Sequence, residues 1–507
     1  KIVNLKTCAK TLVMLSVIAA PVAQAVAQAN KVPAEVIARR LANKKAKQQT
    51  PSVAAKKAKA AGVQLYGYVL SSDERDPGLY KFSSNNAASI SLVNSNVQCY
   101  NAATYVQGTY LSSWYEETDT QVKFPIHFYE YDTSTWQMKI DKPSPELAYS
   151  AISMDLAFDP ETQQVYGLFS DDDYSGTYKT LGKLVTTYWG ENDYTANSVA
   201  IGELPESMVA ITCNKSGDLY TIGRSGKLYA VNKYSGTATV VGETGYKPFK
   251  LFQSATCDYS TGKIYWAMLD QYDWATRIIE IDPATGKGTE VCNFIDNNAY
   301  DQITGLYIKQ DLALKAVPQT VSDLSVDLTS LTSGTVKFTM PSKDVKDAAL
   351  SGSLNYTVRL NGVVAKTGTA AAGAAVNTSF TTTVSGMTNV TVTAEIAASG
   401  NTPAAVSAPV SQSVRLGYDQ PKKPTALKAS AKGQNVTLTW KAPTGGVNGG
   451  FFDADKLTYT VVRVNSSDAT DVTTLAEGIT ETTYTDKIAS PDLATYYYKV
   501  AASNGDM

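Results

Sequence analysis

Residues 157–169 read AFDPETQQVYGLF, and this phrase decides the fold because the chain repeats it. Related phrases are ITCNKSGDLYTI at residues 211–222 and ATCDYSTGKIYWAM at residues 255–268. Each joins a short apolar strand to a tyrosine-containing strand through a turn that opens with Asp or Asn. A second strand phrase accompanies them, as in KLYAVNKYSGTATVVGE (227–243), RIIEIDPATGKGTEVCNF (277–294) and IHFYEYDTSTWQMKI (126–140). The chain is therefore built from units of short strands.

Repeats of roughly 40–50 residues with four short strands each are typical of a β-propeller. The first strands, beginning QLYGYVLSS at residue 64, match the second to fourth strands of later units, and no innermost strand precedes them. The spare strand AYDQITGLYI at residues 299–308 matches an innermost strand. We expect it to complete the first unit, because a closed ring leaves no unpaired edges. The sequence predicts an all-β fold whose residues 63–310 form a five-bladed propeller, with six blades if residues 178–197 hide further strands.

The N-terminal residues indicate export. Lys1, Lys6 and Lys10 precede an apolar stretch and an A-x-A site at residues 27–29, which is typical of a signal peptide over residues 1–29. The alternative, a membrane anchor, is disfavoured because Pro21 and Gln24 interrupt a short apolar run.

Residues 30–62 form a basic arm that is rich in Ala and Lys. Since the chain begins without Met and stops within an expected strand, we expect it to be a fragment.

The distribution of charge narrows the class of partner, and the cysteine and histidine content bears on disulfides and catalysis. The net charge is −2, but residues 30–60 hold nine Lys or Arg against one Glu, so the remainder is acidic and nucleic acid is not the expected partner. Export permits disulfides. Cys213 and Cys257 occupy the same place in successive repeats and could pair, whereas the alternative is that they, Cys99 and Cys292 are four small buried thiols. The chain has a single histidine, His127, which leaves little room for His-based catalysis or metal binding.

Residues 421–507 contain PTALKAS, NVTLTWKAP, LTYTVVRV and TYYYKVAASN, with Trp440 in the second phrase. These phrases resemble strands A, B, C and F of fibronectin type III modules, and Leu493 and Tyr496 resemble the family's tyrosine corner. Residues 317–418 resemble the same family more loosely, with Phe338 in place of Trp440. The resemblance implies two type III-like β-sandwiches that act as spacers, the second truncated. A propeller followed by such modules resembles secreted and surface proteins of Bacteroides-type bacteria.

The loops between the second and third strands of each unit carry the candidate binding residues. They combine carboxylates with aromatic side chains, which stack on sugar rings. The candidate ligand-binding residues are Trp114, Tyr115, Tyr174, Tyr272 and Trp274, and Asp171, Asp172 and Asp173 form a weak Ca²⁺ candidate. The alternative is that these loops are simply hydrophilic. By contrast, Asp159, Asn214 and Asp258 are expected to hold turns by bonding the backbone two residues on.

The sequence also contains one set of carboxylates that could support an enzymatic activity. Asp155, Glu206 and Asp301 fall near the starts of innermost strands, where five-bladed glycosidases place their carboxylates, and two such groups suffice for glycosidic cleavage. The sequence nevertheless favours a secreted or cell-surface, non-enzymatic, monomeric binding or adhesion protein, with no transmembrane span and no required cofactor. Its ligand is expected to be an extracellular glycan or protein. The alternatives are a glycoside-active propeller enzyme using those three residues, or an accessory region of a larger secreted enzyme.

Overall fold

The computed structural model describes residues 62–72, 74–99, 102–115, 126–143, 153–169, 179–185, 197–250, 253–294, 301–488 and 495–504. These ranges are all-β, and the helical element η2 covers only Ala454–Lys456. The chain divides into two compact units. The first unit holds the residues up to Val317 together with 397–405, and the second holds 318–396 and 406–507.

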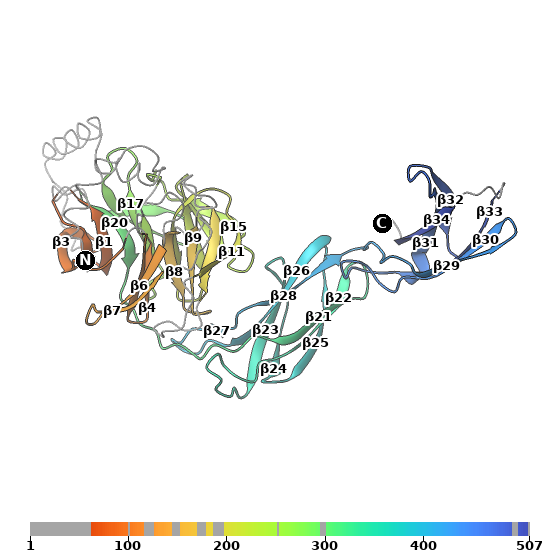
Figure 1. The fold of residues 1–507 in the computed structure, drawn as a ribbon. Helices are drawn as coiled ribbons and strands as arrows, with labels where there is room; N and C mark the ends of the chain where they lie inside the picture. Colours follow the sequence, from red (N-terminus) through yellow and green to blue (C-terminus); the bar gives the residue numbers. More distant parts are fainter. Residues whose placement is uncertain are drawn as a thin grey trace. The chain divides into compact units, whose positions relative to one another are not determined.

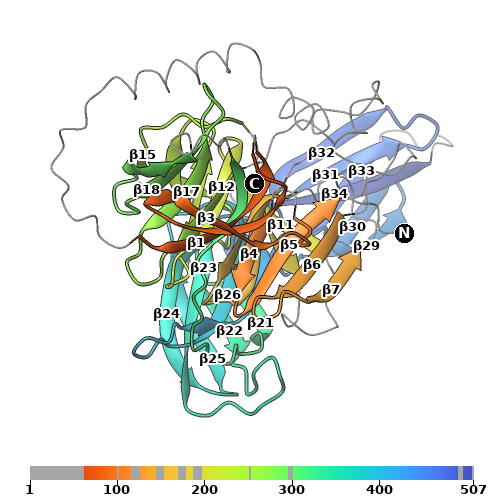
Figure 2. The same cartoon turned by 90° about the vertical axis from the view of Figure 1, so that its left-hand side faces the viewer.

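Within the described residues, the first unit contains five four-stranded antiparallel sheets (Figures 1 and 2). The first sheet has the strand order β20-β1-β2-β3, and the second to fifth sheets each follow chain order. Their strands are β1 (Gln64–Ser71), β2 (Gly78–Ser83), β3 (Asn86–Asn94), β4 (Ala103–Val106), β5 (Thr109–Tyr115), β6 (Ile126–Asp132), β7 (Met138–Pro143), β8 (Ser153–Asp159), β9 (Gln164–Phe169), β10 (Thr180–Val185), β11 (Asn197–Glu203), β12 (Met208–Cys213), β13 (Leu219–Gly223), β14 (Lys227–Val231), β15 (Ala238–Glu243), β16 (Ser254–Cys257), β17 (Ile264–Leu269), β18 (Thr276–Ile281), β19 (Gly288–Asn293) and β20 (Gln302–Tyr307).

The first sheet contains strands from both the beginning and the end of this unit's sequence. β20 pairs antiparallel with β1, so that Tyr66 faces Tyr307 and Val69 faces Ile303, and Figure 1 draws the two strands side by side. The expected pairing of the spare strand with the first strand is therefore confirmed. We call the strand that stands first in each sheet's order its first strand, so that β20 is the first strand of the first sheet. These five first strands neighbour one another in the cyclic order β20, β4, β8, β12, β16 and back to β20. They are among the most buried strands, because both of their faces are covered.

Apolar side chains and glycines hold adjacent sheets together. The fully buried Trp266 of the fifth sheet belongs to a core cluster that includes Val209 and Leu228 of the fourth. At the outer strands the backbones touch, since a Cβ on Gly242 would lie 2.0 Å from the carbonyl oxygen of Thr285. Only glycine permits so close an approach of two backbones.

Among the described residues of this unit, six hairpin turns share one five-residue form. The first side chain, Asp or Asn, accepts a hydrogen bond from the backbone N–H two residues later, and the fifth residue has positive φ. The first and fifth residues are Asp132 and Trp136, Asp159 and Gln163, Asn232 and Gly236, Asp258 and Gly262, Asp270 and Trp274, and Asp282 and Gly286. Asn214 opens a related turn through Ser216 N–H. The expected structural role of Asp159, Asn214 and Asp258 is confirmed.

The second unit contains two pairs of facing sheets. In residues 318–418 the sheets have the orders β21-β22-β25 and β24-β23-β26, with β27 and β28 both paired to β26, and in residues 421–504 the orders β29-β30-β33 and β32-β31-β34. The strands are β21 (Ser322–Leu328), β22 (Ser333–Thr339), β23 (Ser353–Leu360), β24 (Val363–Ala371), β25 (Ala375–Thr381), β26 (Gly386–Ile396), β27 (Ala405–Val406), β28 (Val410–Leu416), β29 (Thr425–Lys432), β30 (Asn435–Lys441), β31 (Leu457–Asn465), β32 (Val472–Ile479), β33 (Thr483–Lys487) and β34 (Tyr496–Asn504). Each pair of sheets encloses its own apolar core, as in a β-sandwich.

The quoted type III phrases fold as expected. PTALKAS, NVTLTWKAP, LTYTVVRV and TYYYKVAASN supply β29, β30, β31 and β34. Trp440 is buried and meets Tyr459 edge to face, with ring centroids 5.3 Å apart. Phe338 packs in the same way against Tyr356 in the other sandwich. Leu493 of the expected tyrosine corner lies outside the described residues, and the ring of Tyr496 lies under the Arg463 guanidinium at 4.9 Å.

Candidate functional site

The loops between second and third strands contact the segments that lead into the first strands. In the first sheet, Ser72 and Arg75 bind Asp301, which precedes β20. In the fourth sheet, the turn at Ser225 binds Glu206, which precedes β12. In the fifth sheet, Trp274 packs on Phe249, which precedes β16. These two sets of segments therefore lie at one end of the sheets, which we call the loop face.

The loop between β17 and β18 is the best-defined part of the loop face. Asp270 pairs with Pro248 as an isolated bridge, and the buried amide of Gln253 binds Phe249 O and Leu269 N–H. The loop thus has a second, hydrogen-bonded backbone segment beneath it. Such a loop presents its side chains in fixed positions.

Two aromatic candidates sit on this loop in different environments. Tyr272 is 54% exposed, which is high for a large aromatic side chain. Trp274 is half-buried, and its ring centroid lies 5.1 Å from that of Phe249. Its φ of 55° is the left-handed conformation that glycine adopts at the same turn position elsewhere in this unit. A bulky residue there is strained, which is common where a side chain must be held at a defined place.

Arg277 of β18 balances the negative charges of the carboxylates on the same loop. Arg277 makes two hydrogen bonds to Asp273, at 3.0 and 2.7 Å, and lies 3.4 Å from Asp270 Oδ2 and from Glu290 Oε2. Burial lowers the pKa of Arg277, but the surrounding carboxylates outweigh this and raise it. Asp270 and Asp273 therefore brace the loop, and an exposed tyrosine remains as its outward-facing group.

The other predicted aromatic candidates are less fully described. Trp114 and Tyr115 lie at the end of β5, paired with His127 and Ile126, because the strand continues further than the sequence suggested. Tyr174 and the Ca²⁺ candidates Asp171, Asp172 and Asp173 lie outside the described residues. Within the described ranges, no group of three or more His, Cys, Asp or Glu side chains is placed to hold a metal ion.

Asp155 lies at the centre of the first strands. Its side chain is fully buried and accepts hydrogen bonds from Ile211 N–H at 3.1 Å, Ala255 N–H at 3.2 Å and the Ser254 hydroxyl at 2.8 Å. Ser254 Oγ in turn accepts from Leu306 N–H. Burial raises the pKa of Asp155 well above its usual range, although these donors favour the ionised form. One carboxyl thus connects four first strands, β8, β12, β16 and β20.

The remaining two candidate carboxylates hold loops. Glu206 accepts from the Ser225 N–H and hydroxyl and from the Tyr229 hydroxyl. Asp301 accepts from the Ser72 hydroxyl at 2.5 Å and forms a 2.7 Å ion pair with Arg75. The structure does not gather Asp155, Glu206 and Asp301 into one hydrogen-bonded group, since each binds its own donors.

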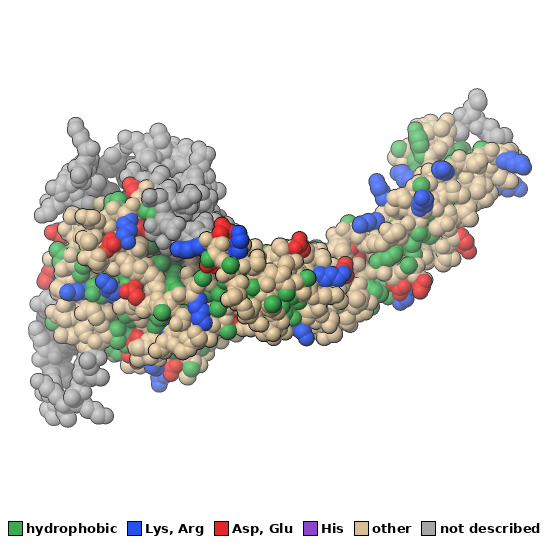
Figure 3. All heavy atoms as spheres, turned by 90° about the horizontal axis from the view of Figure 1, so that it is seen from below, with side chains coloured by type: hydrophobic (Ala, Val, Ile, Leu, Met, Phe, Trp, Pro, Cys, Tyr) green, Lys and Arg blue, Asp and Glu red, His purple; other side chains and the backbone are tan. Residues whose placement is uncertain are grey.

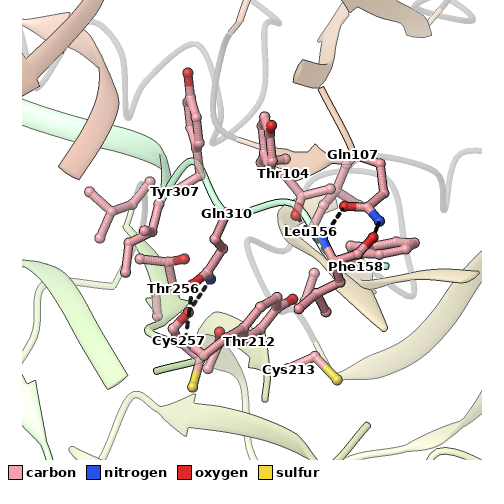
Figure 4. A pocket seen from close by; sticks show the side chains of 17 residues that line it. Thr104, Gln107, Leu156, Phe158, Thr212, Cys213, Thr256, Cys257, Tyr307 and Gln310 are labelled. Atoms are coloured by element: carbon pink, nitrogen blue, oxygen red, sulfur yellow. Dashed lines mark hydrogen bonds between the residues drawn. The ribbon is translucent and has the colours of Figure 1, made fainter. Parts of the chain in front are cut away.

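A small cavity lies among the first strands, and Figure 4 shows its lining. It measures about 30 Å³, room for water rather than for a sugar. Cys213 and Cys257 are on its wall, and no disulfide joins Cys99, Cys213, Cys257 and Cys292. Burial raises the pKa of Cys99 and of Cys257 to about 12, so these thiols are inert packing groups.

The surface carries charges of both signs. On the face of the molecule drawn in Figure 3, acidic and basic side chains are interspersed. No helix within the described residues has the length and apolar character that a membrane span requires.

No protein family model and no curated protein matches this sequence. Among solved structures, it is similar to the FN1–FN3 domains of chicken CNTN1, at 13% identity and a TM-score of 0.18, over 37% of this chain and 62% of that one. It is also similar to a two-domain fibronectin type III segment of chicken tenascin, at 17% identity and a TM-score of 0.19, over 37% of this chain and 93% of that one. Kuenenia stuttgartiensis hydrazine synthase matches at 10% identity and a TM-score of 0.25, over 68% of this chain and 75% of that one. The chain thus spans less than two thirds of the CNTN1 fragment.

Proposed function

We propose that the five sheets of the first unit are the blades of a β-propeller closed by β20, and that the chain is a secreted or cell-surface, non-enzymatic binding protein. Two observations support closure: β20 pairs with β1, and the first strands neighbour one another in a cycle. In this proposal the loop face holds the ligand and the type III-like sandwiches act as spacers.

The observation that carries the proposal is Tyr272, exposed at the tip of a braced loop. An exposed aromatic group at the tip of a rigidly supported loop suggests a contact with a partner. The loop's own carboxylates, Asp270 and Asp273, lie against Arg277, and Tyr272 is the exposed aromatic side chain at the loop tip. A flat ring accepts the apolar face of a sugar, and we propose a glycan as the ligand.

Glycan-array screening of the whole chain, followed by titration of the best hit, tests this proposal. Tyr272→Ala should weaken binding by about 1–3 kcal/mol, the range for a binding hot spot, and leave the melting temperature unchanged. Tyr497→Ala is the matched control, because Tyr497 is also exposed, at 60%, but lies on β34 of the other unit. Equal affinity for parent and Tyr272→Ala would reject this site. Binding to a protein but to no glycan would reassign the ligand class.

A glycoside-cleaving activity has one observation in its favour, the raised pKa of Asp155, which a general acid requires. However, the side chain is fully buried and its oxygens are already bound. If the enzymatic alternative is correct, the parent should cleave a polysaccharide and Asp155→Asn should lower the rate by about 10²–10⁴. No cleavage across a polysaccharide panel would reject it.

A further inference from the structure

The segment that follows β20 is held across the ends of other sheets. Six hydrogen bonds, which involve the side chains of Tyr105, Gln107, Gln163 and Gln310, fix it. Gln310 donates to Cys257 O at 2.6 Å and accepts from Tyr259 N–H at 2.9 Å, and the Tyr105 hydroxyl donates to Asp311 at 2.6 Å. The dashed lines in Figure 4 show Gln310 reaching toward Cys257.

Two glutamines from other sheets complete these contacts. The Gln107 amide accepts from Leu312 N–H at 3.0 Å and donates to Leu312 O at 2.6 Å, as a neighbouring strand would. Gln163 donates to Lys315 O at 2.7 Å. Residues 309–315, which we call the strap, are thus bound to the second, third and fifth sheets.

The backbone conformation of these glutamines supports a structural role for their side chains. Gln107 and Gln163 both have positive φ, 42° and 52°, which is unfavourable for a residue with a side chain. Glycine occupies the position of Gln163 in three related turns, at Gly236, Gly262 and Gly286. An unfavourable backbone conformation is commonly retained at a residue whose side chain makes a needed contact. Both of these side chains bind the strap.

The strap also covers one end of the first strands. Gln107, Gln163 and Tyr259 lie in turns that join first to second strands, which is the end opposite the loop face. The cavity among the first strands is lined there by Gln310 and Leu312 of the strap together with Thr104, Thr212 and Thr256. The strap therefore forms part of the cavity wall at this end.

We infer that the strap is a lock on the closure of the first unit. β20 supplies the hydrogen-bonded pairing between the first sheet's N-terminal strands and the chain's later part, and side-chain packing such as Phe82 on Phe294 adds to it. Separation of β20 from β1 would therefore remove the backbone pairing that joins the two. The strap continues directly from β20, and its bonds to three other sheets hold β20 in place.

Hydrogen exchange of the whole chain, followed by mass spectrometry of peptides covering 302–316 and 64–71, tests the lock. The variants are Gln107→Gly and Gln163→Gly, which remove the amides and also relieve the backbone strain. We expect exchange in both peptides to speed up, by roughly five-fold for each hydrogen bond lost. Gln137→Ala, an exposed glutamine in a turn of the second sheet, is the control and should change neither peptide.

The glycine substitutions separate the two explanations for these residues. If Gln107 and Gln163 were merely turn residues, glycine would suit their backbone better, and exchange would slow or stay the same. That result would overturn the lock. Faster exchange at 302–316 with unchanged exchange at 64–71 would also overturn it, because the strap would then not guard closure.

Discussion

The ammonium nitrogen of Lys233 lies 2.6 Å from Asp159 Oδ2, although the two residues belong to different sheets. Lys233 follows β14 and Asp159 ends β8, and a second carboxylate oxygen, Glu161 Oε2, lies 2.5 Å from the same nitrogen. Lys233 is 7% exposed and Asp159 is fully buried. A buried ion pair therefore joins the third and fourth sheets.

Removal of Lys233 should strongly destabilise the first unit. Lys233→Met leaves the buried Asp159 carboxylate without its partner, which typically costs about 3–5 kcal/mol. Lys263→Met is a comparison variant, since Lys263 is also a lysine next to a hairpin turn of this unit but forms an exposed 3.6 Å pair with Asp282. The control should cost at most about 1 kcal/mol. Urea denaturation of both variants measures the difference, and equal losses would contradict this role of Lys233.

Close backbone contact between neighbouring sheets should make Gly286 irreplaceable. A Cβ on Gly286 would lie 2.7 Å from Gly242 Cα, whereas a Cβ on Gly262 meets nothing within 4 Å. Both have nearly the same φ, 73° and 74°. Gly262→Ala should therefore show only the left-handed strain of about 1–2 kcal/mol, and Gly286→Ala should lose clearly more. Melting curves that coincide for the two variants would show that the sheets can move apart freely.

The stability contributed by Asp155 should fall as pH rises. Because burial raises its folded pKa, the folded state keeps a proton that the unfolded state releases above about pH 4. The stability gap between the parent and Asp155→Asn should therefore shrink as the pH rises above about 4. Denaturation at several pH values measures it, and a gap that widens with pH would show an ionised Asp155.

The stability contributed by Asp132 should depend on pH in the opposite direction to that contributed by Asp155. The hydroxyl and backbone N–H of Ser134, and then Lys139, lower the pKa of this exposed carboxyl. Its stabilising contribution is present above the unfolded pKa and is lost as pH falls. The gap between the parent and Asp132→Asn should accordingly widen as pH rises through about 4.

The repeats allowed much of the fold to be predicted, because strand pairing follows local patterns. The phrase at residues 157–169 and its relatives located the hairpins, and the spare strand near Ile303 indicated its pairing with β1. The type III phrases likewise located β29, β30, β31 and β34. Each of these inferences used residues that are neighbours in the chain or copies of one another.

The roles of individual polar side chains were harder to predict, since their partners lie far away in sequence. Gln107 binds Leu312 across 205 positions, and Asp301 binds Ser72 across 229. Sequence placed Asp301 near the centre of the unit but could not show that a loop already occupies it. The one available signal was Gln163, which stands where related turns have glycine.

Trp440 and Trp274 should respond oppositely to removal. Trp440 is 5% exposed in the core of its sandwich, so Trp440→Ala should destabilise that module by about 3–5 kcal/mol and leave glycan binding intact. Trp274→Gly removes a half-buried ring but relieves its positive φ, so the two effects on stability oppose each other. Its binding should fall by about 1–3 kcal/mol if the ring contacts the ligand. Titration and melting of each variant separate these cases. If Trp274→Gly melts early and binds normally once folded, Trp274 only packs against Phe249, and Tyr272 alone remains as the aromatic contact.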